Sequence, residues 1–282
     1  MVGPDRRPPL RDPVAVAAFE GWNDAGESAT ALVEHLESLW EPMPFASVDP
    51  DEYYDFQVNR PHVGTDSAGE RTLTWPTTRA SVVSPPEHPR DLVLIRGMEP
   101  NLRWRAFCSE LLEILTDAGV QRVLTLGALL ADVPHTRPVP VTASVHDLPE
   151  TDDAEHGLEL SRYEGPTGIT GVFGQAISRA GMESTALWAA VPHYVGQSPC
   201  PKATLALLQR TEDVLDLPIP VGDIATEAEA WQHGVDELAS EDEDVAEYVQ
   251  RLEGAADAED LPEASGEHIA QEFQRYLRRR RD

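Results

Sequence analysis

Residues 92–95 read Leu-Val-Leu-Ile, a continuous apolar run with no polar residue in alternate positions. Such a run is typical of a strand that is buried on both faces, as in a parallel sheet. A helix is predicted from about Leu102 to Ala118, and Gly119 is suited to end it because helices often close on a glycine. The next strand is predicted from Val123 to Leu126. This stretch therefore favours a parallel sheet covered by helices.

The same alternation of strands and helices extends in both directions. Before it, an apolar strand at residues 14–19 is followed by Asp24 and Glu27, which have the spacing of a helix-capping box. The other predicted elements are strands at 141–145 and 185–191, and helices at about 32–40, 168–180 and 202–215. Repetition of this kind predicts an α/β fold, namely a three-layer α/β/α sandwich with a mostly parallel sheet. We assign residues 1–220 to this core domain.

One block within the core domain has a different pattern. Short strand-like segments at 47–48, 71–75 and 80–83 are separated by Pro, Gly and Asp turns, and residues 53–56 form an aromatic, loop-like stretch. We therefore expect residues 45–90 to form either an antiparallel excursion or a long functional loop.

Residues 221–282 differ from the core in composition. Between Asp223 and Gln274 there are 17 acidic residues and a single basic one. Apolar residues recur at helical spacing, at Trp231, Val235, Leu238, Val245, Val249, Leu252 and then Ile269, Phe273 and Leu277. With a break expected at 254–264, this pattern predicts an acidic helical hairpin. We expect its apolar face to pack on the core, with an oligomer seam or a partner helix as alternatives.

Bulk properties exclude several classes of function. The 282 residues carry a net charge of −28, which argues against nucleic-acid binding and against anionic membranes. No apolar run approaches the roughly 18 residues of a membrane span, and the N-terminal residues do not resemble a signal peptide. Two isolated cysteines, Cys108 and Cys200, indicate reduced thiols in a cytoplasmic protein rather than a metal site.

Three polar segments follow predicted strands, and open α/β sheets place ligands at that edge. They contain Trp22, Asn23 and Asp24; Glu99 and Arg103; and Asp132, His135 and Arg137, with His193 beyond a fourth strand. Each has a structural and a functional interpretation. Asn23 or Asp24 is a helix cap or part of a ligand site, and Glu99 with Arg103 is a local ion pair or an acid with an anion clamp.

The third segment leaves the same choice open. His135, with Asp132 and Arg137, is a turn residue or part of an acid–base or phosphate site, and His193 could share its edge. The GxSxG, GxxxxGK[ST] and HExxH signatures are absent, and no nucleophile accompanies the histidines. We therefore predict no catalytic residue, no metal site and no cofactor, and treat these nine residues as a pocket or contact edge.

Four segments taken together resemble the bacterial branch of the proteasome assembly chaperone 2 family: residues 21–26 (GWNDAG), 97–104 (GMEPNLRW), 127–138 (GALLADVPHTRP) and 191–194 (VPHY). The resemblance spans about residues 14–215 and includes the acidic tail. It implies a core like that of nucleoside phosphorylases and related hydrolases, and chaperone-type protein binding in the eukaryotic and archaeal relatives. For bacterial members it implies no established activity. It does not imply the phosphorylase reaction, because a shared fold does not carry chemistry with it.

We therefore interpret the chain as a non-catalytic scaffold or assembly chaperone. Its predicted partners are other proteins, proteasome subunits among them, and further copies of itself. The alternative is a phosphorylase- or hydrolase-like enzyme acting on nucleosides or other small metabolites. Relatives that dock on the proteasome α-ring tend to end in a hydrophobic-Tyr-X tail, whereas this sequence has Tyr276 six residues before Asp282. Docking by that route is therefore not predicted.

Overall fold

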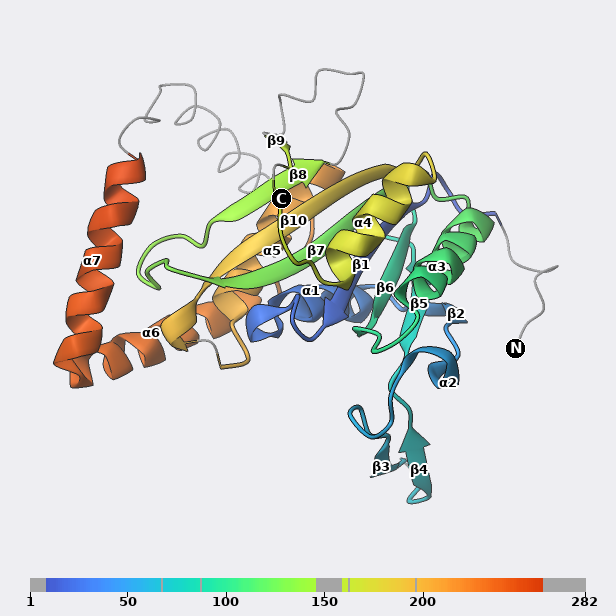
Figure 1. Ribbon diagram of the computed structural model, residues 1–282, viewed down its shortest axis with the longest axis horizontal. Coiled ribbons are helices and arrows are strands. Elements are labelled where there is room, and N and C mark those ends of the chain that lie inside the picture. The colour runs from blue at the N-terminus through green and yellow to red at the C-terminus, as the bar shows by residue number, and fades with distance from the viewer. Residues whose placement is uncertain are drawn as a thin grey trace.

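A computed structural model describes residues 9–66, 68–86, 88–145, 159–161, 163–195 and 197–260. Among these residues, eight strands form one sheet in the order β2-β5-β6-β1-β7-β10-β8-β9 (Figure 1). Its four central strands run parallel; they are β6 (Leu92–Met98), β1 (Val14–Glu20), β7 (Arg122–Ala131) and β10 (Glu183–Pro192). The apolar run at residues 92–95 thus lies in the centre of a parallel sheet.

The sheet becomes antiparallel towards its edges. On one side, β5 (Thr78–Val83) runs antiparallel to β6, and β2 (Met43–Ser47) runs antiparallel to β5. On the other side, β8 (Val141–Val145) is antiparallel to β10, and the short β9 (Glu159–Leu160) is parallel to β8.

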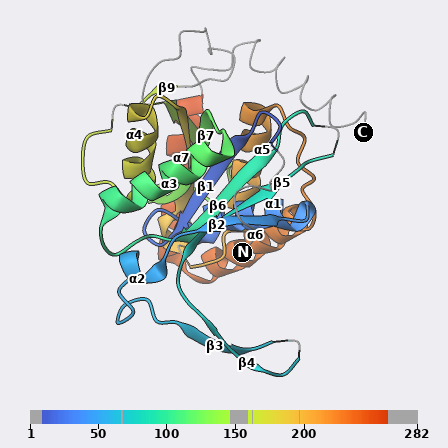
Figure 2. The same ribbon diagram turned by 90° about the vertical axis from the view of Figure 1, so that its right-hand side faces the viewer.

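Helices cover both faces of the sheet because the central strands are apolar on both faces. In β1, Val14, Val16 and Ala18 belong to one core cluster, whereas the residues between them belong to the other. Helices α1 (Ser28–Leu39) and α5 (Pro201–Leu215) pack on the first face, and α3 (Trp104–Ala118) and α4 (Ile169–Arg179) on the second (Figures 1 and 2). The predicted three-layer α/β/α sandwich is therefore confirmed.

Phe19 shows how tightly the second face is packed. Its fully buried ring meets the rings of Phe107 on α3 and Phe173 on α4 edge-on, at centroid distances of 6.0 and 5.9 Å. Full burial of one such side chain contributes about 1.5–3 kcal/mol. The predicted end of α3 is also confirmed, since Gly119 has a φ of 77°, which favours glycine.

Residues 45–90 supply both a sheet edge and a projection. Besides β2 and β5, they contain α2 (Pro50–Tyr53) and a separate two-stranded ribbon of β3 (His62–Thr65) and β4 (Arg71–Thr74). The ribbon extends away from the body in both views (Figures 1 and 2). The expectation of a loop at residues 53–56 is wrong for Tyr53 alone, which ends α2. Tyr53 and Tyr54 are both buried.

Two helices follow the core, α6 (Ile224–Glu241) and α7 (Glu243–Asp260). Ile224 and Trp231 pack against the α1–α5 side of the core, and α7 leaves α6 at a steep angle (Figure 1). The helical segment is interrupted at Asp242, whose carboxylate accepts hydrogen bonds from backbone N–H groups of α7. The interruption predicted from residue 254 is wrong, because residue 254 lies inside α7. The predicted second stripe at residues 269–277 lies outside the described residues.

Candidate functional site

Asp24 is a helix cap, as the structural interpretation held. After β1, the chain makes a short 3₁₀ turn, η2 (Ala25–Glu27), and α1 begins at Ser28. The Asp24 carboxylate accepts hydrogen bonds from the backbone N–H groups of Ala29 at 2.6 Å and Thr30 at 3.3 Å. Burial raises the pKa of Asp24 above its usual value. A capping box would also use the side chain of Glu27, but the capping bonds of Asp24 do not involve it.

Asn23 and Glu99 join the ends of three elements. The Asn23 amide is fully buried and donates to Glu99 Oε1 at 2.9 Å, while the same oxygen accepts from the Ile169 N–H at 2.8 Å. Glu99 therefore holds the N-terminus of α4, where a negative charge is favourable. Gly168 is required beside this pair, since a Cβ there would lie 2.0 Å from Asn23 Oδ1.

The expected ion pair between Glu99 and Arg103 is wrong. Arg103 instead pairs with Glu52 in α2, and its guanidinium lies 5.9 Å from the centre of the Tyr53 ring. Glu99 does not pair with Arg103 because its carboxylate instead accepts a hydrogen bond from the N-terminus of α4, about 70 residues further along the chain. Arg103 thus does not belong to the same cluster as Trp22 and Asn23.

A cleft of about 1620 Å³ lies beside Trp22, between the ends of β1 and β7, strand β8 and the start of α4. Its walls include aromatic rings, aliphatic side chains and hydroxyls, for example Trp188, Leu130 and Thr170. Among the described residues that line it, Asp24 is the only charged one. The Trp22 side chain itself is 72% exposed. This lining suits an uncharged, partly apolar occupant.

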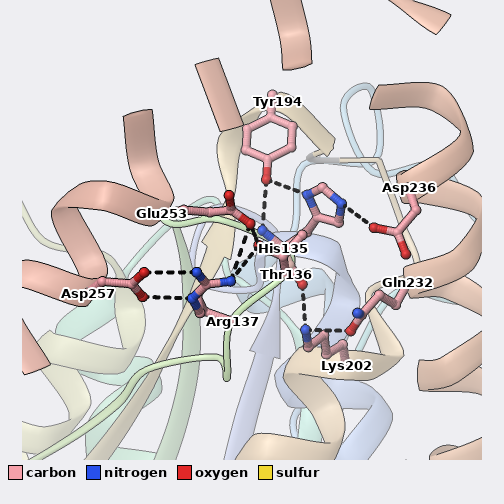
Figure 3. A network of polar contacts seen from close by, with 9 residues as sticks. All are labelled: His135, Thr136, Arg137, Tyr194, Lys202, Gln232, Asp236, Glu253 and Asp257. Atoms are coloured by element: carbon pink, nitrogen blue, oxygen red, sulfur yellow. Dashed lines mark hydrogen bonds and ion pairs between the residues drawn. The ribbon is translucent and has the colours of Figure 1, made fainter. Parts of the chain in front are cut away.

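His135 is not among the residues that line this cleft, and its backbone and both ring nitrogens have hydrogen-bond partners (Figure 3). Its backbone N–H donates to Tyr194 Oη at 2.8 Å, and its ring nitrogens lie 2.7 Å from Tyr194 Oη and 3.0 Å from Asp236 Oδ1. The Lys202 ammonium donates to its carbonyl. If the Tyr194 hydroxyl donates to Nδ1, Nε2 carries the proton and donates to Asp236. His135 therefore ties the loop after β7 to α5 and α6.

Arg137 fastens the same loop to α7 (Figure 3). Its guanidinium makes a two-pronged contact with Asp257, at 2.8 and 2.9 Å, and a third contact with Glu253 at 3.2 Å. Donating hydrogen bonds to the Asp257 carboxylate raises the pKa of Arg137, and accepting them lowers the pKa of Asp257. The charges of Arg137, Asp257 and Glu253 are thereby paired with one another within the chain.

Asp132 and His193 do lie together, as their shared edge suggested. His193, in the short 3₁₀ turn η4 (His193–Val195), has its Nδ1 3.1 Å from Asp132 Oδ1, which also accepts from Tyr248 Oη at 3.2 Å. The Asp132 and His193 side chains are 79% and 44% exposed. Within the described ranges, no three His, Cys, Asp or Glu side chains are grouped as metal ligands.

Comparison with known proteins agrees with this architecture. The model of the PAC2 family matches residues 18–239. The chain belongs to the PAC2 family. None of the curated proteins with which the sequence was compared matches it. In the part of the chain that the structure describes, no helix is both long and apolar enough to span a membrane.

Solved PAC2 structures cover most of the chain. A PAC2 family protein from Streptomyces avermitilis is 56% identical, with a TM-score of 0.77 over 84% of this chain and 100% of its own. The proteasome-assembly chaperone homologue Rv2125 of Mycobacterium tuberculosis is 50% identical, with a TM-score of 0.75 over 84% and 99%. The archaeal proteasome activator PbaB of Pyrococcus furiosus, at 18% identity and a TM-score of 0.63 over 83% and 96%, shares the fold.

In this PAC2 chain the nine predicted residues fall into separate groups. Trp22, Asn23, Asp24 and Glu99 lie near the cleft; Asp132, His135, Arg137 and His193 contact the C-terminal helices; and Arg103 lies apart. Sequence reasoning missed the partners Asp236, Tyr248, Glu253 and Asp257, which no local pattern distinguishes from the surrounding acidic helices. Tyr194 was within reach, because it belongs to the fourth resembling segment.

Proposed function

We propose that this chain is a non-catalytic assembly chaperone or scaffold whose partners are proteasome subunits. Its membership of the PAC2 family supports this role. So does its 50% identity to a protein described as a proteasome-assembly chaperone homologue. Between them, the match and the structural likeness extend over the whole sandwich, which is the part that would present a contact surface.

The observation that carries the proposal is that His135 and Arg137 already have partners within the chain. A general acid or base must be within hydrogen-bond reach of the substrate, and an anion clamp must offer free donors. Both ring nitrogens of His135 already have partners, and its side chain is 1% exposed. Arg137 is engaged by Asp257 and Glu253. These groups act as fastenings for the C-terminal helices.

The alternative enzyme, a nucleoside or small-metabolite phosphorylase or hydrolase, would use the cleft. Phosphate binding usually relies on Arg or Lys side chains. Asp24 is the single charged residue among the described residues lining the cleft, and its carboxylate repels an anion. The cleft therefore favours contact with protein over phosphorolysis.

We propose the exposed pair of Asp132 and His193 as part of the edge that contacts the partner. These side chains can reach another protein without any rearrangement of the chain. Trp22 is also exposed, but it lies at the cleft, and Arg103 lies apart beside α2, so neither belongs to this edge. Within the group of Asp132 and His193, His135 is buried.

The experiment measures binding of the purified full chain to proteasome subunits of the same source, in three separate arms: free α subunits, free β subunits and the assembled core particle. A chaperone should bind free subunits more tightly than the assembled particle and should speed assembly on native gels. His193→Ala should weaken binding, whereas His233→Ala, on the exposed surface of α6, should not. Failure to bind any of the three forms would refute the proposal.

A parallel screen addresses the enzyme. Nucleosides, inorganic phosphate and nucleotides are added to the full chain, and its melting temperature is measured. A ligand at about 100 times its Kd stabilises a protein by about 2.7 kcal/mol, a shift that melting curves resolve. If a nucleoside together with phosphate stabilises the chain and is then turned over, the enzyme replaces the chaperone as the proposed function.

A further inference from the structure

Helices α6 and α7 meet at an elbow (Figure 1), and a groove of about 470 Å³ lies there. Its walls come from the turn η4, the C-terminal half of α6 and the start of α7. We call it the elbow groove, and the described residues that line it are Tyr194, Val195, Val235, Leu238, Ala239, Glu241, Asp242 and Val245. Apart from two acidic residues, this lining is aliphatic or aromatic. The groove therefore suits apolar side chains.

The apolar stripe of α6 continues past the part of the core that covers it. Trp231 packs against the core and Val235 is buried, whereas Leu238, the next residue of the stripe, is 63% exposed. Among the described residues, no other leucine is as exposed. An exposed apolar side chain that lines a groove, rather than standing singly on the surface, indicates a contact surface.

Charge selects the occupant of this groove. Residues 237–247 contain no basic residue and six acidic ones, namely Glu237, Glu241, Asp242, Glu243, Asp244 and Glu247. In the described part of the chain, no Arg or Lys side chain pairs with any of these carboxylates. An acidic segment would be repelled here, whereas a basic segment would be attracted. The elbow groove therefore fits a segment that is both apolar and basic.

The chain has such a segment after α7. Residues 261–282 lie outside the described residues, and their sequence has both properties. Apolar residues recur at helical spacing at Ile269, Phe273 and Leu277. Residues 273–281 include five arginines and no acidic residue. This stretch therefore matches the groove in apolar character and opposes it in charge.

The length of the segment matches the way back to the groove. Helix α7 has 18 residues, so at 1.5 Å per residue it is about 27 Å long. Residues 261–281 span about 31 Å even when they are wholly helical, and more when they are extended. A return alongside α7 can therefore bring Leu277 and the arginines that follow it to the elbow.

We propose that residues 261–282 fold back along α7 and cover the elbow groove of their own chain. Leu277 then lies on the exposed Leu238, and the arginines lie against the acidic residues of the elbow. The covalent link holds the segment at a local concentration of about a millimolar, which favours the groove of the same chain over that of another copy. The inference goes beyond the proposed function, because it concerns a contact within one chain.

The first test is a disulfide between segment and groove in the full chain. Both native thiols, Cys108 and Cys200, are buried. On oxidation, Leu238→Cys combined with Leu277→Cys should link within one chain at every protein concentration, as a non-reducing gel shows. The control combines Leu277→Cys with His233→Cys, an exposed position on α6 about 140° around the helix from Leu238. Most of the linkage should be lost in this control.

The second test measures hydrogen–deuterium exchange of the full chain. The amides of residues 269–277 should exchange about 10-fold faster in Leu238→Gln than in wild type, because the apolar contact is lost while the charges remain. Leu102→Gln, the same change at a 53% exposed leucine before α3, should leave this exchange unchanged. Added salt should speed the exchange in wild type, because it screens the attraction between arginines and carboxylates.

Charge reversal identifies the pairing. Glu237→Arg with Glu241→Arg should speed exchange of the segment at least about 10-fold, since attraction becomes repulsion at two positions. Arg279→Glu with Arg280→Glu should do the same. The chain that carries all four changes should regain slow exchange, because opposite charges face each other again.

The matched control is Glu113→Arg with Asp117→Arg, which reverses two exposed charges of the same spacing at the end of α3 and should have no effect. Three results would overturn the proposal. One is equal exchange of residues 269–277 in wild type and all elbow variants. Another is equal linkage of Leu277→Cys to both positions on α6. The third is a disulfide that joins two chains instead of closing within one.

Discussion

Replacing His135 by alanine tests whether this residue is structural. The ring is 1% exposed and makes two hydrogen bonds, to Tyr194 and Asp236. Each bond contributes about 1 kcal/mol, and the cavity left by the ring costs about 1–2 kcal/mol more. The bond from Lys202 ends on the backbone carbonyl and survives the substitution. We expect His135→Ala to lower the free energy of unfolding by about 3 kcal/mol.

Urea unfolding followed by tryptophan fluorescence measures this loss. With a slope of about 3 kcal/mol per molar urea for a chain of this size, the midpoint should fall by about 1 M. His193→Ala is the matched control. Its side chain is 44% exposed and its partner Asp132 is 79% exposed, so the cost should stay below about 1 kcal/mol.

Equal stability of His135→Ala and wild type would refute this reasoning. A simple turn residue on an exposed loop, as the sequence alone suggested, would cost at most about 1–2 kcal/mol. A double-mutant cycle with Asp236→Asn adds a second check, because two groups in direct contact should show a coupling of about 0.5 kcal/mol or more. Loss of a catalytic activity without loss of stability would instead assign His135 to chemistry.

Three further predictions concern other parts of the chain. Gly168→Ala should lower the free energy of unfolding by about 2 kcal/mol, because its methyl group would collide with the buried amide of Asn23. Gly234→Ala in α6 should raise that free energy by up to about 1 kcal/mol, and thermal unfolding compares the two variants. Arg137→Gln should speed amide exchange in α7 by about 2- to 5-fold, while Arg122→Gln, in another exposed ion pair, should leave it unchanged. Burial raises the pKa of Asp24, so its charge costs stability as pH rises. The free energy of unfolding relative to Asp24→Asn should fall as the pH rises above about 4, measured by urea titration.

The sandwich could be predicted because its signals are local. The apolar run at residues 92–95 identifies a strand buried on both faces, and Gly119 marks where the following helix ends. The lengths of the strands were harder to predict from the sequence. Strand β7 extends to Ala131, five residues beyond its predicted end, because pairing with β10 continues along Gly127–Ala131. That pairing depends on a partner about 60 residues away.

The sequence placed the nine candidate residues after strands but did not give most of their contacts. Asp24 could be assigned as a cap because it lies just before the predicted helix, although its carboxylate reaches Ala29 and Thr30 across the intervening 3₁₀ turn. The partners of Glu99 and Arg103 could not, since each depends on how distant helices pack on the sheet. The break at Asp242 was hidden because the apolar spacing continues across it in phase. Only the capping bonds made by its side chain show where one helix ends and the next begins.

The contacts of the C-terminal helices bear on the choice between the two proposed functions. Chemistry at His135 or Arg137 would require α6 and α7 to leave, and departure would break the contacts to Asp236, Glu253 and Asp257. It would also expose apolar residues of both helices, which are buried in the folded chain. Contact with a protein through His193 and Asp132 needs no such opening, because these side chains already face solvent. Binding therefore uses the chain as it folds, whereas catalysis at these residues must first undo part of the fold.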